Sequence, residues 1–119
     1  MEWEVEFTDE FGVWWEALSE VEQDCVRFGV ELVKSNGPNL GRPHVDAARG
    51  SRHSNMKELR TQCQGRPLRT FFAFDPRRSA ILLIGGDKTG KQRFYDEMVP
   101  LADRLYDEHL QELKDEGLV

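Results

Sequence analysis

Two neighbouring segments that are apolar on both faces constrain the fold of this chain most strongly. Residues 68–75 read Leu-Arg-Thr-Phe-Phe-Ala-Phe-Asp, and residues 79–86 read Ser-Ala-Ile-Leu-Leu-Ile-Gly-Gly. Strands with apolar side chains on both faces are typical of the middle of a sheet, where other elements cover each face. Between them, Asp75-Pro76-Arg77-Arg78 predicts a tight hairpin turn, because proline favours the second position of a turn. The sequence therefore predicts an antiparallel pair of strands at the centre of the fold.

The first 38 residues are predicted to form one strand and two helices. Apolar residues at positions 3, 5 and 7 alternate with glutamates, as in a half-buried strand. Thr8 is placed to cap a short helix, and Ser19 and Glu22 have the spacing of a capping box for a second one. The second helix is expected to end at Asn36-Gly37-Pro38. We expect it to bury one side that consists of Val21, Cys25, Phe28, Leu32 and Val33.

The remaining segments complete an α+β fold. Residues up to about Asn55 indicate a loop with one short strand, and a further strand is predicted at Met56–Arg60. Residues 85–90 indicate a loop, and an amphipathic helix is expected from about Pro100 through Leu113. This order predicts an antiparallel-rich twisted sheet of about four to five strands, with two N-terminal helices and a C-terminal helix. A length of 119 residues fits a single domain, residues 1–119.

The charge of the chain is strongly segregated. The formal net charge is −6, but residues 42–93 contain twelve Lys or Arg and only four Asp or Glu. The rest of the chain contains four basic and eighteen acidic residues. Local potential, rather than the average, attracts a polyanion to a surface. The middle of the chain is therefore the part that could bind RNA.

The composition favours a cytoplasmic protein without a metal or cofactor. No apolar run approaches the roughly 20 residues of a membrane span, and the acidic N-terminal segment lacks the features of a secretory signal. Cys25 and Cys63 share no metal-ligand spacing with the histidines. We expect both cysteines to be buried or unreactive thiols.

One glycine-rich motif resembles a phosphate-binding loop but lacks an essential residue. Gly85 and Gly90-Lys91 have the required spacing, whereas Gln92 stands where Ser or Thr would hold magnesium. We therefore expect these glycines to let the backbone turn sharply at the end of a strand.

Cations at strand positions are the most informative polar feature. Arg69 lies in an apolar strand, where a charged group is costly to bury unless it is paired. It either forms an ion pair with Glu58, or takes an outward edge position, or joins a cationic site across neighbouring strands. Lys57 and Arg60 lie in the preceding strand and would point to opposite faces. We expect Arg60 to be the one that faces such a site.

Four segments together resemble the RelE/HigB toxins, and most closely their phage-derived Gp49-like branch. They are Leu40-Gly41-Arg42-Pro43, Met56-Lys57-Glu58-Leu59-Arg60, the strand at 68–75, and Leu82 to Lys88. The resemblance covers nearly the whole chain in element order, although each motif is short. It implies a RelE-like fold, ribosome-dependent cleavage of mRNA, and neutralisation by a cognate helix-turn-helix antitoxin in a hetero-oligomer.

The resemblance also implies roles for individual residues. Arg60 and Arg69 would clamp the phosphate and stabilise its developing charge, because the arginine fork matches phosphate geometry. Lys88 would act as acid or base, with Tyr95 and His53 as weaker candidates for proton transfer. The expected catalytic set is Arg60, Arg69, Lys88, Lys57 and Tyr95, and the expected RNA-binding set is Arg42, Arg49, Arg52, His53, Lys91 and Arg93.

Two other functions remain open. One is that of a ParE-like member of the same fold, which inhibits DNA gyrase without cutting RNA. The other is that of a non-catalytic, phage-derived regulatory binding module. The cationic strand positions favour cleavage over both, because a target made only of protein gives no reason for phosphate clamps.

Overall fold

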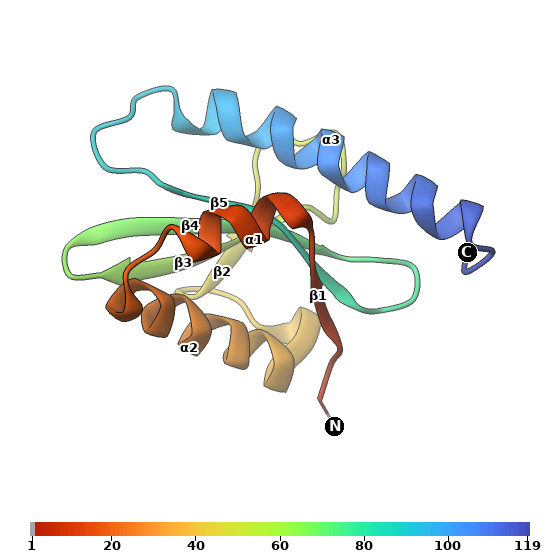
Figure 1. The fold of residues 1–119 in the computed structure, drawn as a ribbon, viewed down its shortest axis with the longest axis horizontal. Coiled ribbons are helices and arrows are strands. Elements are labelled where there is room, and N and C mark those ends of the chain that lie inside the picture. Colours follow the sequence, from red (N-terminus) through yellow and green to blue (C-terminus); the bar gives the residue numbers. More distant parts are fainter. Residues whose placement is uncertain (1) are drawn as a thin grey trace.

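A computed structural model describes residues 2–119 and confirms the α+β architecture, a five-stranded sheet with helices on both faces (Figure 1). The strands are ordered β1-β5-β4-β3-β2, and only β1 and β5 pair in parallel. In chain order the elements are β1 (Val5–Phe7), α1 (Asp9–Glu16), α2 (Glu20–Asn36), the 3-10 helix η1 (Gly37–Asn39), β2 (Val45–Ala47), β3 (Lys57–Cys63), β4 (Arg66–Phe74), β5 (Ala80–Asp87) and α3 (Phe94–Asp115).

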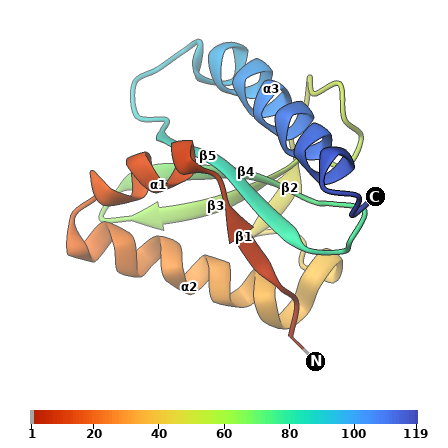
Figure 2. The same cartoon turned by 45° about the vertical axis from the view of Figure 1, so that its right-hand side comes forward.

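The central antiparallel pair predicted from the sequence is β4 and β5. Its turn is closed by two backbone hydrogen bonds, from Asp75 N–H to the Ser79 carbonyl and from Arg78 N–H to the Asp75 carbonyl. The helices α1 and α2 cover one face of the sheet, and α3 covers the other (Figure 2). Phe71 and Leu83 pack under α3, whereas Phe72 and Leu82 pack under α1 and α2. This two-sided burial is the reason that both strands are apolar throughout.

The helix starts agree with those predicted from the sequence, but the buried face of α2 agrees only in part. Thr8 caps α1, and Ser19 and Glu22 form the capping box of α2. Of the predicted face Val33 is buried, whereas Val21 and Phe28 are 47% and 65% exposed, which was not expected. The stripe that packs on the sheet is rotated along the helix and consists of Glu22, Val26, Gly29 and Val33. Gly29 belongs to it because the side chain of Leu59 packs directly against its backbone.

The last helix begins six residues earlier than expected, at Phe94, so Pro100 lies inside it. A proline inside a helix removes one backbone hydrogen bond. Here Pro100 is on the exposed side, and burial of Phe94 and Val99 against the sheet stabilises the extra turns. Although α3 has 22 residues, no helix among residues 2–119 is long and apolar enough to cross a membrane.

Gly85 and Gly86 lie within β5 rather than in a loop. Neither has the positive backbone angle that a sharp turn would require. Instead, the Trp14 ring occupies the space that a side chain of Gly85 would need, and the Phe94 ring does the same at Gly86. The two glycines therefore allow the helices on opposite faces to approach the sheet closely.

The two cysteines form a disulfide between α2 and β3, which corrects the expectation of two separate thiols. They are 38 residues apart in the chain, and their Cα atoms are 5.9 Å apart, within the usual range for a disulfide. Packing of α2 on β3 creates this proximity, and sequence spacing alone gives no sign of it.

Candidate functional site

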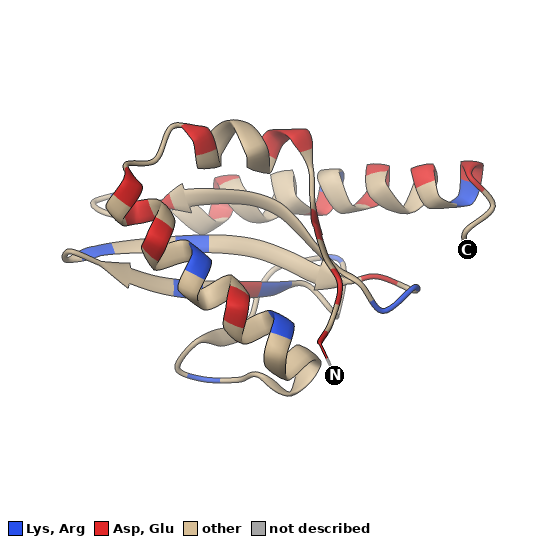
Figure 3. Ribbon diagram, turned by 60° about the horizontal axis from the view of Figure 1, so that its bottom comes forward, with Lys and Arg blue, Asp and Glu red and all other residues tan. Residues whose placement is uncertain are grey.

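Charges are separated in space as well as along the chain. Most acidic residues lie on the helices and along β1, whereas most cations lie on the other strands and on the loops beside them, with a few cations on α2 and α3 (Figure 3). The basic residues of β3 and β4 come together because the register places Arg60 directly opposite Arg69. A cross-strand pair of like charges is unfavourable unless an opposite charge lies between them.

A cavity of about 470 Å³ opens beside this pair, and we call it the Arg60 cavity. It lies where β2 and β3 meet the end of β5 and the first turn of α3. Its walls are therefore drawn from four separate parts of the chain. The lining residues are Arg42, Asp46, Ala47, Arg49, Glu58, Arg60, Lys88 and Tyr95.

The carboxylate of Glu58 joins the groups at the floor of this cavity. Its Oε1 atom lies 3.4 Å from Nε of Arg60 and 3.4 Å from Nε of Arg69. The Tyr95 hydroxyl donates a hydrogen bond of 2.9 Å to the same oxygen. Glu58 is 5% exposed, so this carboxylate depends on its partners for stabilisation. One buried acid therefore allows two arginines to face each other across the strands.

The two arginines of this cluster differ in their access to the cavity. The side chain of Arg60 is 38% exposed and lines the cavity, whereas that of Arg69 is 8% exposed and lies beneath it. Besides pairing with Glu58, Arg69 donates hydrogen bonds to the Tyr95 hydroxyl at 3.3 Å and to the carbonyl of Leu68. Arg60 is thus placed to contact a ligand, and Arg69 is placed to hold Glu58 and Tyr95.

Tyr95 and Lys88 complete the side of the cavity nearest to α3. Burial and the adjacent Glu58 carboxylate raise the pKa of the Tyr95 hydroxyl, although Arg69 opposes the shift. The hydroxyl consequently stays protonated and acts as a donor to Glu58. The Lys88 Nζ atom lies 5.3 Å from the centre of the Tyr95 ring, within the range of a cation–π contact.

Only some of the site residues predicted from the sequence line the Arg60 cavity in the described part of the chain, residues 2–119. Alternation along β3 places Lys57 on the face opposite Glu58 and Arg60, with Leu59. Lys91 and Arg93 are exposed in the loop before α3 and are not among the residues that line the cavity. The residues that do line it are Arg42, Arg49, Arg60, Lys88 and Tyr95.

In the structure Arg52 and His53 contact α3 and do not line the Arg60 cavity. The Asp107 carboxylate accepts hydrogen bonds from the Arg52 guanidinium and contacts the His53 ring at 2.7 Å. Next to it, the buried Asp103 carboxylate accepts from Ser51 and from the backbone N–H of Arg52. These contacts fasten the loop after β2 to α3, and that loop also carries Arg49.

Sequence reasoning missed two acidic members of the cavity. Glu58 was expected only as a partner that would neutralise Arg69, and that ion pair is present. The signal that could have identified it is a carboxylate two residues before Arg60 in a strand, hence on the same face. Asp46 pairs with Arg42 at 2.9 Å on the rim and carried no such signal.

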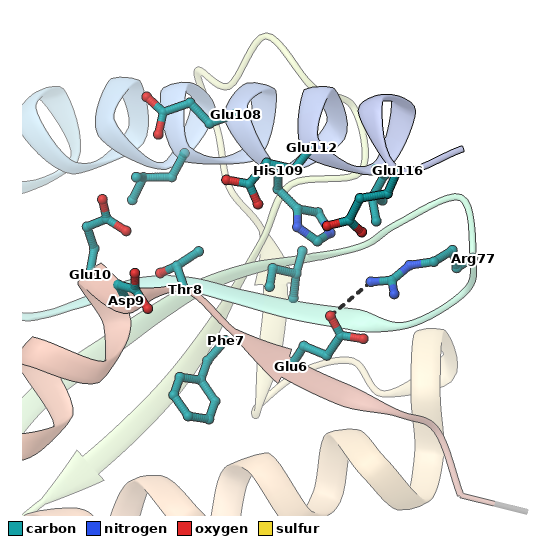
Figure 4. Close-up of a pocket in the computed structure, with 13 residues that line it drawn as sticks. Glu6, Phe7, Thr8, Asp9, Glu10, Arg77, Glu108, His109, Glu112 and Glu116 are labelled. Atoms are coloured by element: carbon teal, nitrogen blue, oxygen red, sulfur yellow. Dashed lines mark hydrogen bonds and ion pairs between the residues drawn. The ribbon is translucent and has the colours of Figure 1, made fainter. Parts of the chain in front are cut away.

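A second cavity, of about 320 Å³, has the opposite charge (Figure 4). It lies between the start of α1, the last turns of α3 and the β4–β5 turn. Its two basic groups are engaged, since Arg77 pairs with Glu6 and His109 is hydrogen-bonded to Asp75. Six carboxylates line this second cavity: Glu6, Asp9, Glu10, Glu108, Glu112 and Glu116. They would repel phosphate, so the Arg60 cavity is the candidate site for an anionic ligand.

Asp75, behind this second cavity, gives the fold a pH dependence that can be measured. Burial would raise the pKa of its carboxyl, but hydrogen bonds from Arg77, His109 and the Ser79 backbone outweigh burial and lower the pKa below its ordinary value. A carboxyl whose pKa is lowered by folding stabilises the protein at pH values above its unfolded-state pKa. This stabilisation is lost as the pH falls through its folded-state pKa. We therefore expect the free energy of unfolding, measured by urea titration, to fall progressively as the pH is lowered below about 5. Asp75→Asn should flatten this decline, and identical pH profiles for the two proteins would contradict the assignment.

The chemistry available in the Arg60 cavity is that of cations and one tyrosine hydroxyl around a carboxylate. Among residues 2–119, no group of three or more His, Cys, Asp or Glu side chains is arranged to hold a metal ion. Four cations on its walls, at positions 42, 49, 60 and 88, outnumber the two carboxylates of Asp46 and Glu58, so the cavity carries a net positive charge that favours an anion such as a phosphodiester.

Comparison with known proteins yields one family and two relatives. A family described as phage derived protein Gp49-like (DUF891) matches residues 13–107. A Mycobacterium tuberculosis protein named "Putative toxin HigB2" is 43% identical over 109 residues, which covers 90% of this chain and 54% of that protein. Another, named "Putative toxin HigB3", is 47% identical over 92 residues, which covers 76% of this chain and 79% of that protein. The chain thus spans about half the length of the first relative and most of the second.

Proposed function

This chain belongs to the phage-derived Gp49-like family of HigB/RelE-like toxins, and from that premise we propose that it is the toxin of a type II toxin–antitoxin system, an endoribonuclease that cleaves mRNA on the ribosome. The observation that carries the proposal is the Arg60 cavity, where cations surround the hydrogen-bonded pair of half-buried Tyr95 and buried Glu58. A phosphodiester is the ligand whose charge and shape suit this cavity. The inhibitor is a helix-turn-helix antitoxin, which we expect to be encoded beside the toxin.

RNA supplies its own nucleophile, the 2′-hydroxyl next to the scissile phosphate. Attack of the 2′-oxygen on phosphorus forms a cyclic phosphate and breaks the bond from phosphorus to the 5′-oxygen. Arg60 holds the non-bridging oxygens and stabilises the charge that develops on them, because its guanidinium reaches the cavity. Lys88 donates a proton to the departing 5′-oxygen.

Removal of the 2′-proton is assigned to Tyr95 and Glu58 acting together. As the Tyr95 oxygen accepts the 2′-proton, its own proton passes to Glu58 Oε1, 2.9 Å away. This relay avoids a free phenolate, in accordance with the raised pKa of Tyr95. Arg69 fixes both groups in place from below. Arg42 and Arg49, on the rim, bind neighbouring phosphates.

Induced expression with mapping of transcript ends tests the proposal. We expect translation to stop and mRNA to be cut within codons, leaving 2′,3′-cyclic or 3′-phosphate ends, because the 2′-oxygen is the nucleophile. An Arg60→Ala chain expressed to the same level is the matched control and should leave transcripts intact. Intact mRNA together with gyrase-dependent DNA breaks would refute cleavage and favour the ParE-like alternative.

A further inference from the structure

A groove of about 590 Å³ runs between α2 and the edge of β3, on the side away from β4, and we call it the α2–β3 groove. It adjoins the Arg60 cavity, because Arg60 lines both. Its walls include Cys25, Phe28, Pro43, Arg60, Thr61 and Gln62.

The edge of β3 is open along this groove. β2 pairs only with residues 57–59 of β3, and the last contact on that side is the hydrogen bond of 2.7 Å from Arg60 N–H to the His44 carbonyl. In an antiparallel ladder, alternate residues bond to the same neighbouring strand. The N–H and C=O of Gln62 therefore point past the end of β2. Such an edge can pair with one more extended segment.

One side chain in the groove also favours an occupant. Phe28 is 65% exposed, although it lies beside Gly29 and Val26, which are buried against the sheet. An occupant that brings an apolar side chain to Phe28 would remove this apolar surface from water.

Charge indicates what kind of segment this is. Arg60 lines both the groove and the Arg60 cavity, its side chain is 38% exposed, and its partner Glu58 lines the Arg60 cavity and not the groove. A carboxylate that enters from the groove would pair with the exposed side of Arg60 and compete with an RNA phosphate for it.

We propose that the α2–β3 groove is the docking site of the inhibitor protein, and that one extended segment of the inhibitor pairs with the backbone of Gln62, packs an apolar side chain on Phe28 and places a carboxylate on Arg60. The identity of the partner rests on the proposed function, whereas the location rests on the open strand edge. Binding there inhibits cleavage directly, because Arg60 cannot hold an acid and a phosphate at once.

The experiment uses the full chain and the small protein encoded by the neighbouring gene, with affinity measured by calorimetry in the absence of RNA. Phe28→Ser should weaken binding about tenfold or more, since a phenylalanine buried on docking contributes that much. Phe7→Ser is the matched control, because Phe7 is 64% exposed and lines a different apolar groove along β1. Its effect should be less than about twofold. Both substitutions are at exposed positions, so both variants should fold.

Hydrogen exchange of the complex provides the second measurement. The backbone amide of Gln62 should become protected when the inhibitor binds. Loss of affinity in Phe7→Ser but not in Phe28→Ser, protection along β1 instead of at Gln62, or absence of binding would each overturn the proposal. Because these measurements need no RNA, docking at the groove by a chain that cuts no mRNA would contradict only the proposed function.

Discussion

Arg60→Ala is expected to lower the rate of RNA cleavage about a hundredfold while leaving the fold intact. Arg60 is the one arginine of the central cluster that lines the cavity, and the reaction develops negative charge where its guanidinium reaches. Loss of one such transition-state contact costs about 3 kcal/mol, which corresponds to roughly a hundredfold in rate. Glu58 retains Arg69 as a partner at 3.4 Å, so the carboxylate is not left unpaired.

Single-turnover cleavage of a defined mRNA on ribosomes, with unfolding followed by circular dichroism, measures both effects. Arg60→Lys should recover part of the rate, since it restores the charge but not the planar fork of donors. Arg104→Ala is the matched control, because Arg104 is an exposed arginine on α3 that pairs only with Glu108. A cleavage rate for Arg60→Ala equal to that of the Arg104→Ala control would remove Arg60 from the mechanism.

Arg69→Ala is expected to have its largest effect on stability. Its side chain is 8% exposed and neutralises the carboxylate of Glu58, which is buried to the same extent. Removal of one partner of a buried ion pair is strongly destabilising, and we expect a loss of about 3 kcal/mol in the free energy of unfolding because Arg60 still contacts Glu58. That would be a large fraction of the stability of a domain of this size.

A double-mutant cycle tests this assignment. Glu58→Gln in the Arg69→Ala background removes a buried charge that has lost one of its two arginine partners, so urea unfolding should show the double variant to be more stable than Arg69→Ala alone. If the second substitution adds its full cost instead, the two residues are not coupled and Arg69 has another role. Cleavage per folded molecule should also fall in Arg69→Ala, because Tyr95 loses the donor that orients its hydroxyl.

The site was only partly accessible from the sequence. Charge counting along the chain identified the basic middle region, and strand alternation placed Lys57 and Arg60 on opposite faces. Glu58 was named as a possible ion-pair partner of Arg69, and that pair is present, but its contacts with Arg60 and Tyr95 were not predicted because they depend on how β3, β4 and α3 pack. Arg52 and His53 were grouped with the site since they are near it in sequence. Their carboxylate partners lie on α3, about fifty residues away.

The features that the sequence predicts correctly are those that neighbouring residues decide among themselves. The capping box of α2 and the Asp75–Arg78 turn depend on interactions within a few residues, and the two-sided apolar pattern of β4 and β5 is visible in consecutive residues of each strand. Hydrogen-bonding requirements and the alternation of side chains are local properties, so these elements could be predicted with their order and fold class.

Tertiary packing decides which of these elements meet and through which side chains. Burial of Gly29 rather than Phe28 follows from the approach of Leu59 on β3, a contact between residues thirty positions apart. The disulfide, the rings packed over Gly85 and Gly86, and the convergence of Glu58, Arg69 and Tyr95 have the same origin. Each depends on the distance between surfaces that are remote in sequence, and periodicity within one segment contains no information about that distance.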